Sequence, residues 1–485
     1  MEIDSKNQEK TGLVSCVCGS IRACLRKLKE KAVIFAKKTN KVGRDDPRRI
    51  VHSTKVGLAL TIVSLLYYFR PLYDGFGQSG MWAILTVVVV FEFTVGGTLC
   101  KCLNRGFATF TAGALGIGAE HFASLCGEKG KPIILGLSVF FLAATSTFIR
   151  FFPHIKRRYD YGVLIFILTF SLVTVSGYRV EQIFELAHQR ISTILIGAAT
   201  CMIISIFLYP VWAGKDLHNL VASNIEKLAN FLEGFGGENS FVLSQDDNSF
   251  LQDYTSVLNT KATEESLANL AWWEPSHGGF RFSHPWKQYL EIGALVRECA
   301  CQLEALSSCN KSQPKAATDI QRKIRKPCKR MSSEAGKALK EIASAIKAMR
   351  HPSSSTVETH VRNSKSAVDE LTSVLETLSS SAKPPADHGI MEITQAIAIA
   401  SILVEIIKCV ERISESVFEL SKQARFNKNC STTLSPSTTT TPPEKTHILH
   451  HGKVKLVNHV DGGHVVILVR DTTHEHPPPP VTTGE

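Results

Sequence analysis

Apolar residues between positions 51 and 212 gather in blocks that short polar breaks separate. A helix needs about 20 apolar residues to cross a hydrocarbon core, or fewer when its flanks reach the interface. One such block would fit a soluble core, but six in succession are hard to bury there. The pattern therefore predicts a transmembrane domain of six helices. The six blocks are residues 56–69, 81–95, 106–125, 132–149, 161–176 and 191–209.

After Trp212 the apolar residues recur every three or four positions, which is the period of amphipathic helices with one buried face. Stretches rich in Gly, Pro and Ser separate these helices. We therefore predict a cytosolic α-helical domain over residues 213–428. Its expected helices are residues 216–233, 251–270, 286–307, 316–349, 364–379 and 391–425.

Residues 429–485 are of low complexity, which predicts a disordered C-terminal tail. Within it, residues 453–470 alternate like a hairpin, but two isolated strands are marginal in water. The predicted fold class is therefore all-α. It comprises a basic cytosolic N-terminal segment (1–50), a transmembrane pore domain (51–212), a cytosolic helical domain (213–428) and the tail (429–485).

The distribution of charge predicts how the chain is oriented in the membrane. The net charge is +11, and residues 22–49 alone hold eleven basic and three acidic residues. The excess is therefore local, which argues against a uniformly basic, nucleic-acid-binding surface. Basic residues favour the cytoplasmic side of a membrane, and the loops on the N-terminal side hold six of them against three opposite. We expect both termini in the cytosol, with the basic segment on anionic lipid.

Motifs of enzymatic chemistry are absent from the sequence. It contains no paired catalytic carboxylates on a soluble scaffold, no nucleophile elbow and no Walker motif. The 13 cysteines include no CxxC pair, and seven of the 17 histidines fall in the tail without the spacing of a zinc site. We therefore expect no enzyme, no cofactor and no energised pump.

Two opposite charges lie at one end of the first two blocks. Lys55 opens the first block and Glu92 lies near the end of the second, so the two have similar depth. We interpret them as an ion pair or as residues that line an inner vestibule. Simple snorkelling of each side chain to the interface is the alternative.

Two arginines begin apolar blocks from opposite sides. Arg105 precedes the third block and Arg190 precedes the sixth. A guanidinium stays charged at cellular pH and is costly in a membrane unless water or a partner reaches it. Shared in a dimer, four guanidiniums could replace part of an anion's hydration shell. We expect them to form an anion path, with lipid-phosphate anchoring as the alternative.

Three acidic residues fall on the outer side of the predicted topology. Glu181 and Glu185 are four residues apart and share a helix face, and Asp74 lies in another outer loop. Converging carboxylates favour a hard multivalent cation. A solvated acidic rim is the alternative.

Six segments within about residues 45–297 are specific in combination, and three of them contain Lys55, Glu92, Arg105 or Phe207. The segments are DDPRRIVHSTKVGLAL, MWAILTVVVVFEFTVGGTLCKCLNRG, TFIRFFPHIKRRYDYG, FILTFSLVTVSGYR, FLYPVWAGKDLH and WWEPSHGGFRF. Through them the chain resembles the plant aluminium-activated malate transporter family of anion channels. The resemblance implies a homodimer with six spans per subunit, a cytosolic helical domain and passive flow of malate, chloride and nitrate.

The resemblance also implies roles for single residues. The arginines of CLNRG and AHQRIS, here Arg105 and Arg190, lie in the conduction pathway. The charges of HSTKVG and VFEF, Lys55 and Glu92, lie at its inner part. In members that respond to aluminium, acidic residues act at the outer mouth, at positions that Asp74, Glu181 and Glu185 occupy. The stretch around Phe207 resembles one linked to modulation by GABA.

The sequence thus predicts a plant anion channel for malate and inorganic anions, with many spans in a membrane. The plasma membrane is favoured over the vacuolar membrane. Two alternatives stay open: a proton-coupled secondary carrier or efflux protein for organic or aromatic acids, and a membrane-tethered scaffold whose helical domain binds partners.

Overall fold

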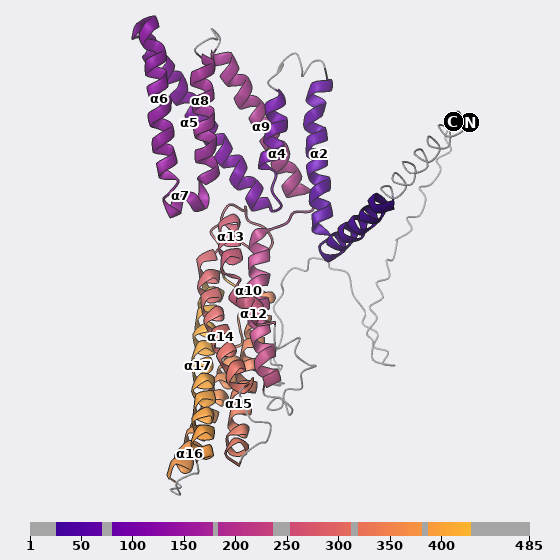
Figure 1. The fold of residues 1–485 in the computed structure, drawn as a ribbon, viewed down its shortest axis with the longest axis vertical. Coiled ribbons are helices and arrows are strands. Elements are labelled where there is room, and N and C mark those ends of the chain that lie inside the picture. Colours follow the sequence, from indigo (N-terminus) through magenta and orange to yellow (C-terminus); the bar gives the residue numbers. More distant parts are fainter. Residues whose placement is uncertain are drawn as a thin grey trace, which may run out of the picture. The chain divides into compact units, whose positions relative to one another are not determined.

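In the computed structural model the chain divides into two compact units, Met1–Asn429 and Cys430–Glu485. The structure describes residues 26–69, 80–177, 183–235, 253–311, 319–380 and 387–427. These ranges contain helices, turns and two isolated bridges, but no strand. The predicted all-α fold class is therefore confirmed for them (Figure 1). The predicted tail and its hairpin lie outside these ranges.

The first group of helices, which we call the N-terminal bundle, contains all six apolar blocks. Each block lies mostly on one helix, and a short helix, α7, precedes α8. The helices are α2 (Arg48–Tyr68), α4 (Met81–Val90), α5 (Val95–Ser124), α6 (Gly127–Ile149), α7 (Pro153–Arg158), α8 (Asp160–Gly177) and α9 (Ile183–Phe207).

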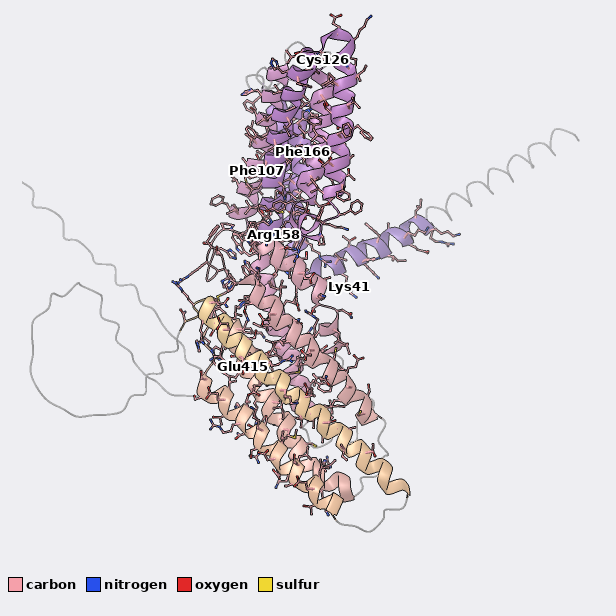
Figure 2. The ribbon with its side chains drawn as sticks, turned by 90° about the vertical axis from the view of Figure 1, so that its left-hand side faces the viewer. Lys41, Phe107, Cys126, Arg158, Phe166 and Glu415 are labelled. Carbon is pink, nitrogen blue, oxygen red and sulfur yellow. The ribbon has the colours of Figure 1, made fainter. Side chains whose placement is uncertain are left out.

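Among the described residues, two segments are long and apolar enough to cross a membrane, Gly127–Ile149 and Arg190–Phe207. Only 11% of the first segment is buried, whereas a soluble core helix would be buried along most of its length. Exposed apolar side chains such as Phe107 on α5, 70% exposed, agree with a lipid-facing surface (Figure 2). The full count of six spans stays a prediction.

Small residues let the helices of the N-terminal bundle approach closely. A Cβ added at Gly197 of α9 would lie 2.8 Å from the carbonyl oxygen of Ala83 on α4. A Cβ at Gly116 of α5 would lie 2.7 Å from a methyl carbon of Val173 on α8. Helices α4, α5, α8 and α9 therefore form the packed part of this bundle.

The predicted boundary between the second and third blocks was wrong. Helix α4 ends at Val90 and α5 begins at Val95, whereas we expected the second block to continue to Val95 and a loop to follow from Gly96 to Arg105. Thr94 caps α5 by accepting a hydrogen bond from the Gly97 amide at 3.1 Å, as N-cap residues do. The polar residues of this stretch thus lie inside a helix.

The second group, which we call the C-terminal bundle, has an apolar core along its helices. Buried apolar residues of α10, such as Leu217, Val221, Leu228 and Leu232, recur every three or four positions. The predicted amphipathic pattern is confirmed, although residues 251–270 form two helices and α16 begins earlier than expected. The helices are α10 (Ala213–Phe235), α12 (Thr255–Leu258), α13 (Lys261–Ala271), α14 (Trp286–Lys311), α15 (Asp319–Lys347), α16 (Ser354–Ser380) and α17 (Asp387–Gln423).

Candidate functional site

Arg105 lies in the interior of α5 and is only 4% exposed. Its Nη1 donates a hydrogen bond to the hydroxyl oxygen of Tyr161 on α8, 3.2 Å away. Its Nε is buried and has no hydrogen-bond partner, and no acidic side chain of the described ranges forms an ion pair with it. A buried guanidinium without a counter-charge is unfavourable, so this position is suited to an incoming anion.

Arg190 lies on the second turn of α9 and has a similar environment. Its guanidinium carbon lies 4.5 Å from the ring centroid of Trp82 on α4. This cation–π contact positions the charge without neutralising it. The Nε of Arg190 is also buried without a hydrogen-bond partner. Its N–H groups can therefore donate to an anion.

Arg105 and Arg190 lie closer together along the helix axes than the two opposite ends of a membrane span would. The thiol of Cys102 on α5 lies 3.6 Å from the carbonyl oxygen of Ala198 on α9. These helices are antiparallel, because the start of α5 bonds to the chain just after α9 (Val95 amide to Val211 carbonyl, 2.9 Å).

Arg105 and Arg190 consequently lie on the same side of that contact. At about 1.5 Å per residue, they are about 5 and 12 Å from it along the helix axes. They lie closer together along the helix axes than we expected, because α5 begins well before its apolar block does. Their position at the ends of spans stays a prediction.

The expected pair between Lys55 and Glu92 is replaced by two other contacts. Lys55, 3% exposed, donates from Nζ to the carbonyl oxygen of Tyr209 at 2.8 Å. The carboxylate of Glu92 forms an ion pair with Lys101 on α5. The sequence interpretation missed Lys101 because it placed this residue in a loop.

Tyr161 contacts both cations of this part of α5. Its hydroxyl accepts from Arg105, and Nζ of Lys101 lies 5.6 Å from its ring centroid. Tyr161 was counted only as part of an apolar block. Its contacts depend on the packing of α8 against α5, which periodicity alone does not show.

Two further pairs of opposite charges lie in the N-terminal bundle. Lys131 of α6 pairs with Glu120 of α5 at 2.5 Å. Arg150 donates two hydrogen bonds to the carboxylate of Asp160, at 2.7 and 3.1 Å. These charges near helix ends are paired, whereas Arg105 and Arg190 lack an acidic partner among the described residues.

The predicted outer cation site is not covered by the structure. Asp74 and Glu181 lie outside the described residues, and Glu185 lies on the first turn of α9 with its side chain outside them too. Within the ranges that the structure covers, no group of three or more His, Cys, Asp or Glu could hold a metal ion. The site stays a prediction. Phe207, the predicted modulator position, ends α9 and is 80% exposed.

The segment between α9 and α10 is held at three points. The Tyr209 carbonyl accepts from Lys55, and the Val211 carbonyl accepts from the Val95 amide. The Trp212 ring stacks on His277, with the ring centroids 3.8 Å apart. This short segment therefore connects α2, α5 and the loop after α13.

Glu274 holds the start of α10, and the sequence interpretation did not single it out. Its carboxylate accepts hydrogen bonds from the amides of Ala213 at 2.6 Å and Gly214 at 3.0 Å. Burial raises the pKa of Glu274 to about 7, although these backbone donors and the Gly96 amide favour its charged form. The only sequence signal was an acidic residue inside the WWEPSHGGFRF segment.

Further contacts join the two bundles beside Glu274. The guanidinium of Arg158, labelled in Figure 2, lies 4.1 Å from the ring centroid of Trp272. Arg48 donates from Nη1 to both carboxylate oxygens of Asp216, at 3.0 and 3.2 Å. The junction therefore involves α2, α5 and α7 on one side and α10 and α13 on the other.

Comparison with known proteins gives one consistent result. A family model described as aluminium activated malate transporter matches residues 40–389. Aluminum-activated malate transporter 2 of Arabidopsis thaliana is 48% identical over 443 residues, which cover 89% of this chain and 87% of the relative. Transporter 7 of that plant is 48% identical over 82% of this chain and 84% of its own. Aluminum-activated malate transporter 1 of Triticum aestivum is 43% identical over 88% of this chain and 94% of its own.

Proposed function

Because the chain belongs to the aluminium-activated malate transporter family, we propose that it is an anion channel that passes malate, chloride and nitrate passively. Membership in this family makes it a membrane transport protein of a plant type and not an enzyme. We also propose the plasma membrane rather than the vacuolar membrane as its location, with both termini in the cytosol.

The observation that supports an anion path is the pair of uncompensated guanidiniums at Arg105 and Arg190. Fixed positive charges with free N–H donors attract anions and replace part of their hydration. Moving one charge through 100 mV is worth about 2.3 kcal/mol, so a malate dianion gains about twice that on leaving a negative cytosol. A passive pore is therefore sufficient.

We propose that the pathway is shared in a homodimer, so that two copies of each arginine contribute. The exposed apolar side chains of α5, such as Phe107 and Phe110, offer a surface for lipid or for a second copy. Cross-linking of the purified protein in bilayers tests this assembly. A protein that stays monomeric while conducting would contradict it.

Current recordings in a heterologous cell test the function. With malate, chloride and nitrate exchanged in turn, Arg105→Ala and Arg190→Ala should each remove most of the current at unchanged surface expression. Arg157→Ala is the matched control, because Arg157 is exposed on α7, and it should leave the current unchanged. Currents that survive both pore variants would exclude these arginines from the pathway, and the scaffold alternative predicts that neither variant changes the behaviour of the protein.

A secondary carrier can be distinguished from a channel by whether anion flux is coupled to protons. A channel gives unitary current steps and a reversal potential that follows the anion gradient. A carrier gives flux tied to the proton gradient and no unitary steps. Strict proton coupling would replace the channel by a carrier for organic or aromatic acids.

We further propose that Asp74, Glu181 and Glu185 bind a trivalent cation at the outer mouth. Three carboxylates give the oxygen ligands that hard cations prefer. Asp74→Asn and Glu181→Gln should abolish any response to external aluminium and leave the basal current. A response that survives both changes would exclude this site.

The modulator role of Phe207 is tested in the same way, by comparing Phe207→Ala with the unmodified channel in the presence of GABA.

A further inference from the structure

Residues 26–45 form a helix that precedes α2, and every side chain from 26 to 42 is exposed. Leu28, Phe35 and Val42 recur every seven residues, so they form one stripe along the helix. They are 57%, 71% and 40% exposed. The smaller residues Ala32 and Thr39 lie on the same face by their spacing. An apolar stripe of this kind requires a partner that covers it.

The rest of this helix surface is mainly basic, although Val33 and Ile34 are also exposed on it, 47% and 66%. Eight basic and two acidic residues in the helix leave a net charge of +6. Lys31 and Lys38 border the stripe, because each lies one turn from two of its members. The basic residues are Arg26, Lys27, Lys29, Lys31, Lys37, Lys38, Lys41 and Arg44.

We propose that helix 26–45 lies in the interface of an anionic bilayer leaflet. Leu28, Phe35 and Val42 would insert at the boundary between headgroups and acyl chains, and the lysines would bind lipid phosphates. Basic amphipathic helices with aromatic or aliphatic residues on one face bind membranes in this way. The proposal requires that α2 enters the membrane, but it does not depend on which solute the protein transports.

The connection to α2 favours a bilayer over a protein partner. Only Asp46 and Pro47 separate the helix from α2. Gly43 contacts Ile50 across this joint, since a Cβ on Gly43 would lie 3.0 Å from the Ile50 side chain. Because α2 is the first proposed span, the basic helix begins where the lipid headgroups are. An acidic protein would have to compete with that surface.

The position of the helix can be measured in the full-length protein. A fluorescent amino acid sensitive to its environment is placed at Thr39, on the stripe face, or at Asn40, away from it. The protein is reconstituted in nanodiscs of phosphatidylcholine, with or without phosphatidylserine, and with spin-labelled lipid as the quencher. We expect several-fold stronger quenching at Thr39 than at Asn40, stronger still with phosphatidylserine, and weaker at high salt.

Two variants test whether the stripe causes the quenching. Phe35→Glu should abolish most of the quenching at Thr39. Val33→Glu makes a similar change on the side of the helix opposite Val42 and should preserve it. Anion current recorded from both variants checks that the channel is intact, so that failure of the surface helix is distinguished from failure of the proposed function.

Three outcomes would overturn the proposal. The first is equal quenching at Thr39 and Asn40, and the second is full quenching in Phe35→Glu. The third is a Thr39 probe that stays in water in anionic nanodiscs but shifts on addition of calmodulin, an acidic protein that binds amphipathic helices. That result would assign the helix to a protein partner.

Discussion

Tyr161 positions the buried cation of the candidate pathway. Its hydroxyl oxygen accepts a hydrogen bond from Nη1 of Arg105. The Nε of the same guanidinium is buried and has no hydrogen-bond partner. A hydrogen bond to a charged group contributes about 1.5–3 kcal/mol. The hydroxyl therefore fixes the direction in which the remaining N–H groups point.

Tyr161→Phe should reduce the malate current several-fold, but less than Arg105→Ala, because the charge remains while its orientation is lost. The concentration of malate that gives half-maximal current should rise. Tyr159→Phe is the control, since the Tyr159 ring packs on Trp273 rather than on an arginine of the pathway. An unchanged half-saturating concentration in Tyr161→Phe would show that the hydroxyl does not position Arg105.

Glu274 makes the stability of the junction depend on pH. Its pKa rises from its usual value of 4.5 to about 7 because the carboxyl is buried. Since the folded pKa lies above the unfolded one, the folded state binds more protons between these values. The contribution of Glu274 to the stability of the fold is fully present below about pH 4.5, and it is lost as the pH rises through about 7.

We expect a loss of about 3 kcal/mol of stability over this range from Glu274 alone. Glu274→Gln should remove this part of the pH dependence. Thermal unfolding of the reconstituted protein, followed between about pH 5 and pH 8, measures it. Glu265→Gln, an exposed neighbour on α13, should behave like the unmodified protein. Parallel curves for the Glu274 variant and the unmodified protein would contradict the assignment.

At the scale of elements, the sequence located the helices but not all of their ends. Apolar blocks identified α2, α4, α5, α6, α8 and α9, because a helix with an apolar surface needs little else to be recognised. The start of α5 was missed because Gly96, Gly97, Lys101 and Arg105 resemble a loop in composition. Their helical state depends on the cap at Thr94 and on packing against α13, which are not properties of a local window.

Gly96 shows how closely α5 and α13 approach. A Cβ on Gly96 would lie 2.2 Å from the carbonyl oxygen of Leu270, and a backbone atom cannot move aside as a flexible side chain can. Gly96→Ala should therefore displace one helix and cost about 1–3 kcal/mol, the usual range for overpacking.

Gly113→Ala is the matched control in the same helix, because a Cβ there meets no atom within 4 Å. Thermal unfolding and current amplitude should change in Gly96→Ala and stay near normal in Gly113→Ala. Equal behaviour of the two variants would show that the α5–α13 contact does not support the fold.

At the scale of the whole molecule, family-specific segments indicated the transport class before any geometry was known. They did not reveal the junction, because its partners are far apart in sequence. Arg48 and Asp216 are 168 residues apart, and Lys55 and Tyr209 are 154 apart. Neither pair has a spacing or motif that a single sequence displays. The correct partner of Glu92 was missed for a more local reason, the misplaced start of α5.

The Arg48–Asp216 pair links the start of the first helix of the bundle to α10. Arg48→Asp would place like charges beside Asp216 and Asp46, and we expect a shifted current–voltage relation. The double swap Arg48→Asp with Asp216→Arg should restore part of the shift. Exposed pairs contribute less than about 1 kcal/mol, so the effect should be moderate. Arg49→Asp is the control. A double swap whose current–voltage relation is shifted as much as that of Arg48→Asp would exclude coupling through this pair.

Tyr209 gives the connection between the two bundles a mechanical property. Its φ angle is +47°, a region that residues other than glycine seldom adopt, and its carbonyl is held by Lys55. The chain thus leaves α9 through a restrained turn rather than through a flexible linker. We therefore expect a rotation of α10 to be transmitted to α9, the helix that carries Arg190. A ligand of the C-terminal bundle that rotates α10 would then change the orientation of this guanidinium without contacting it.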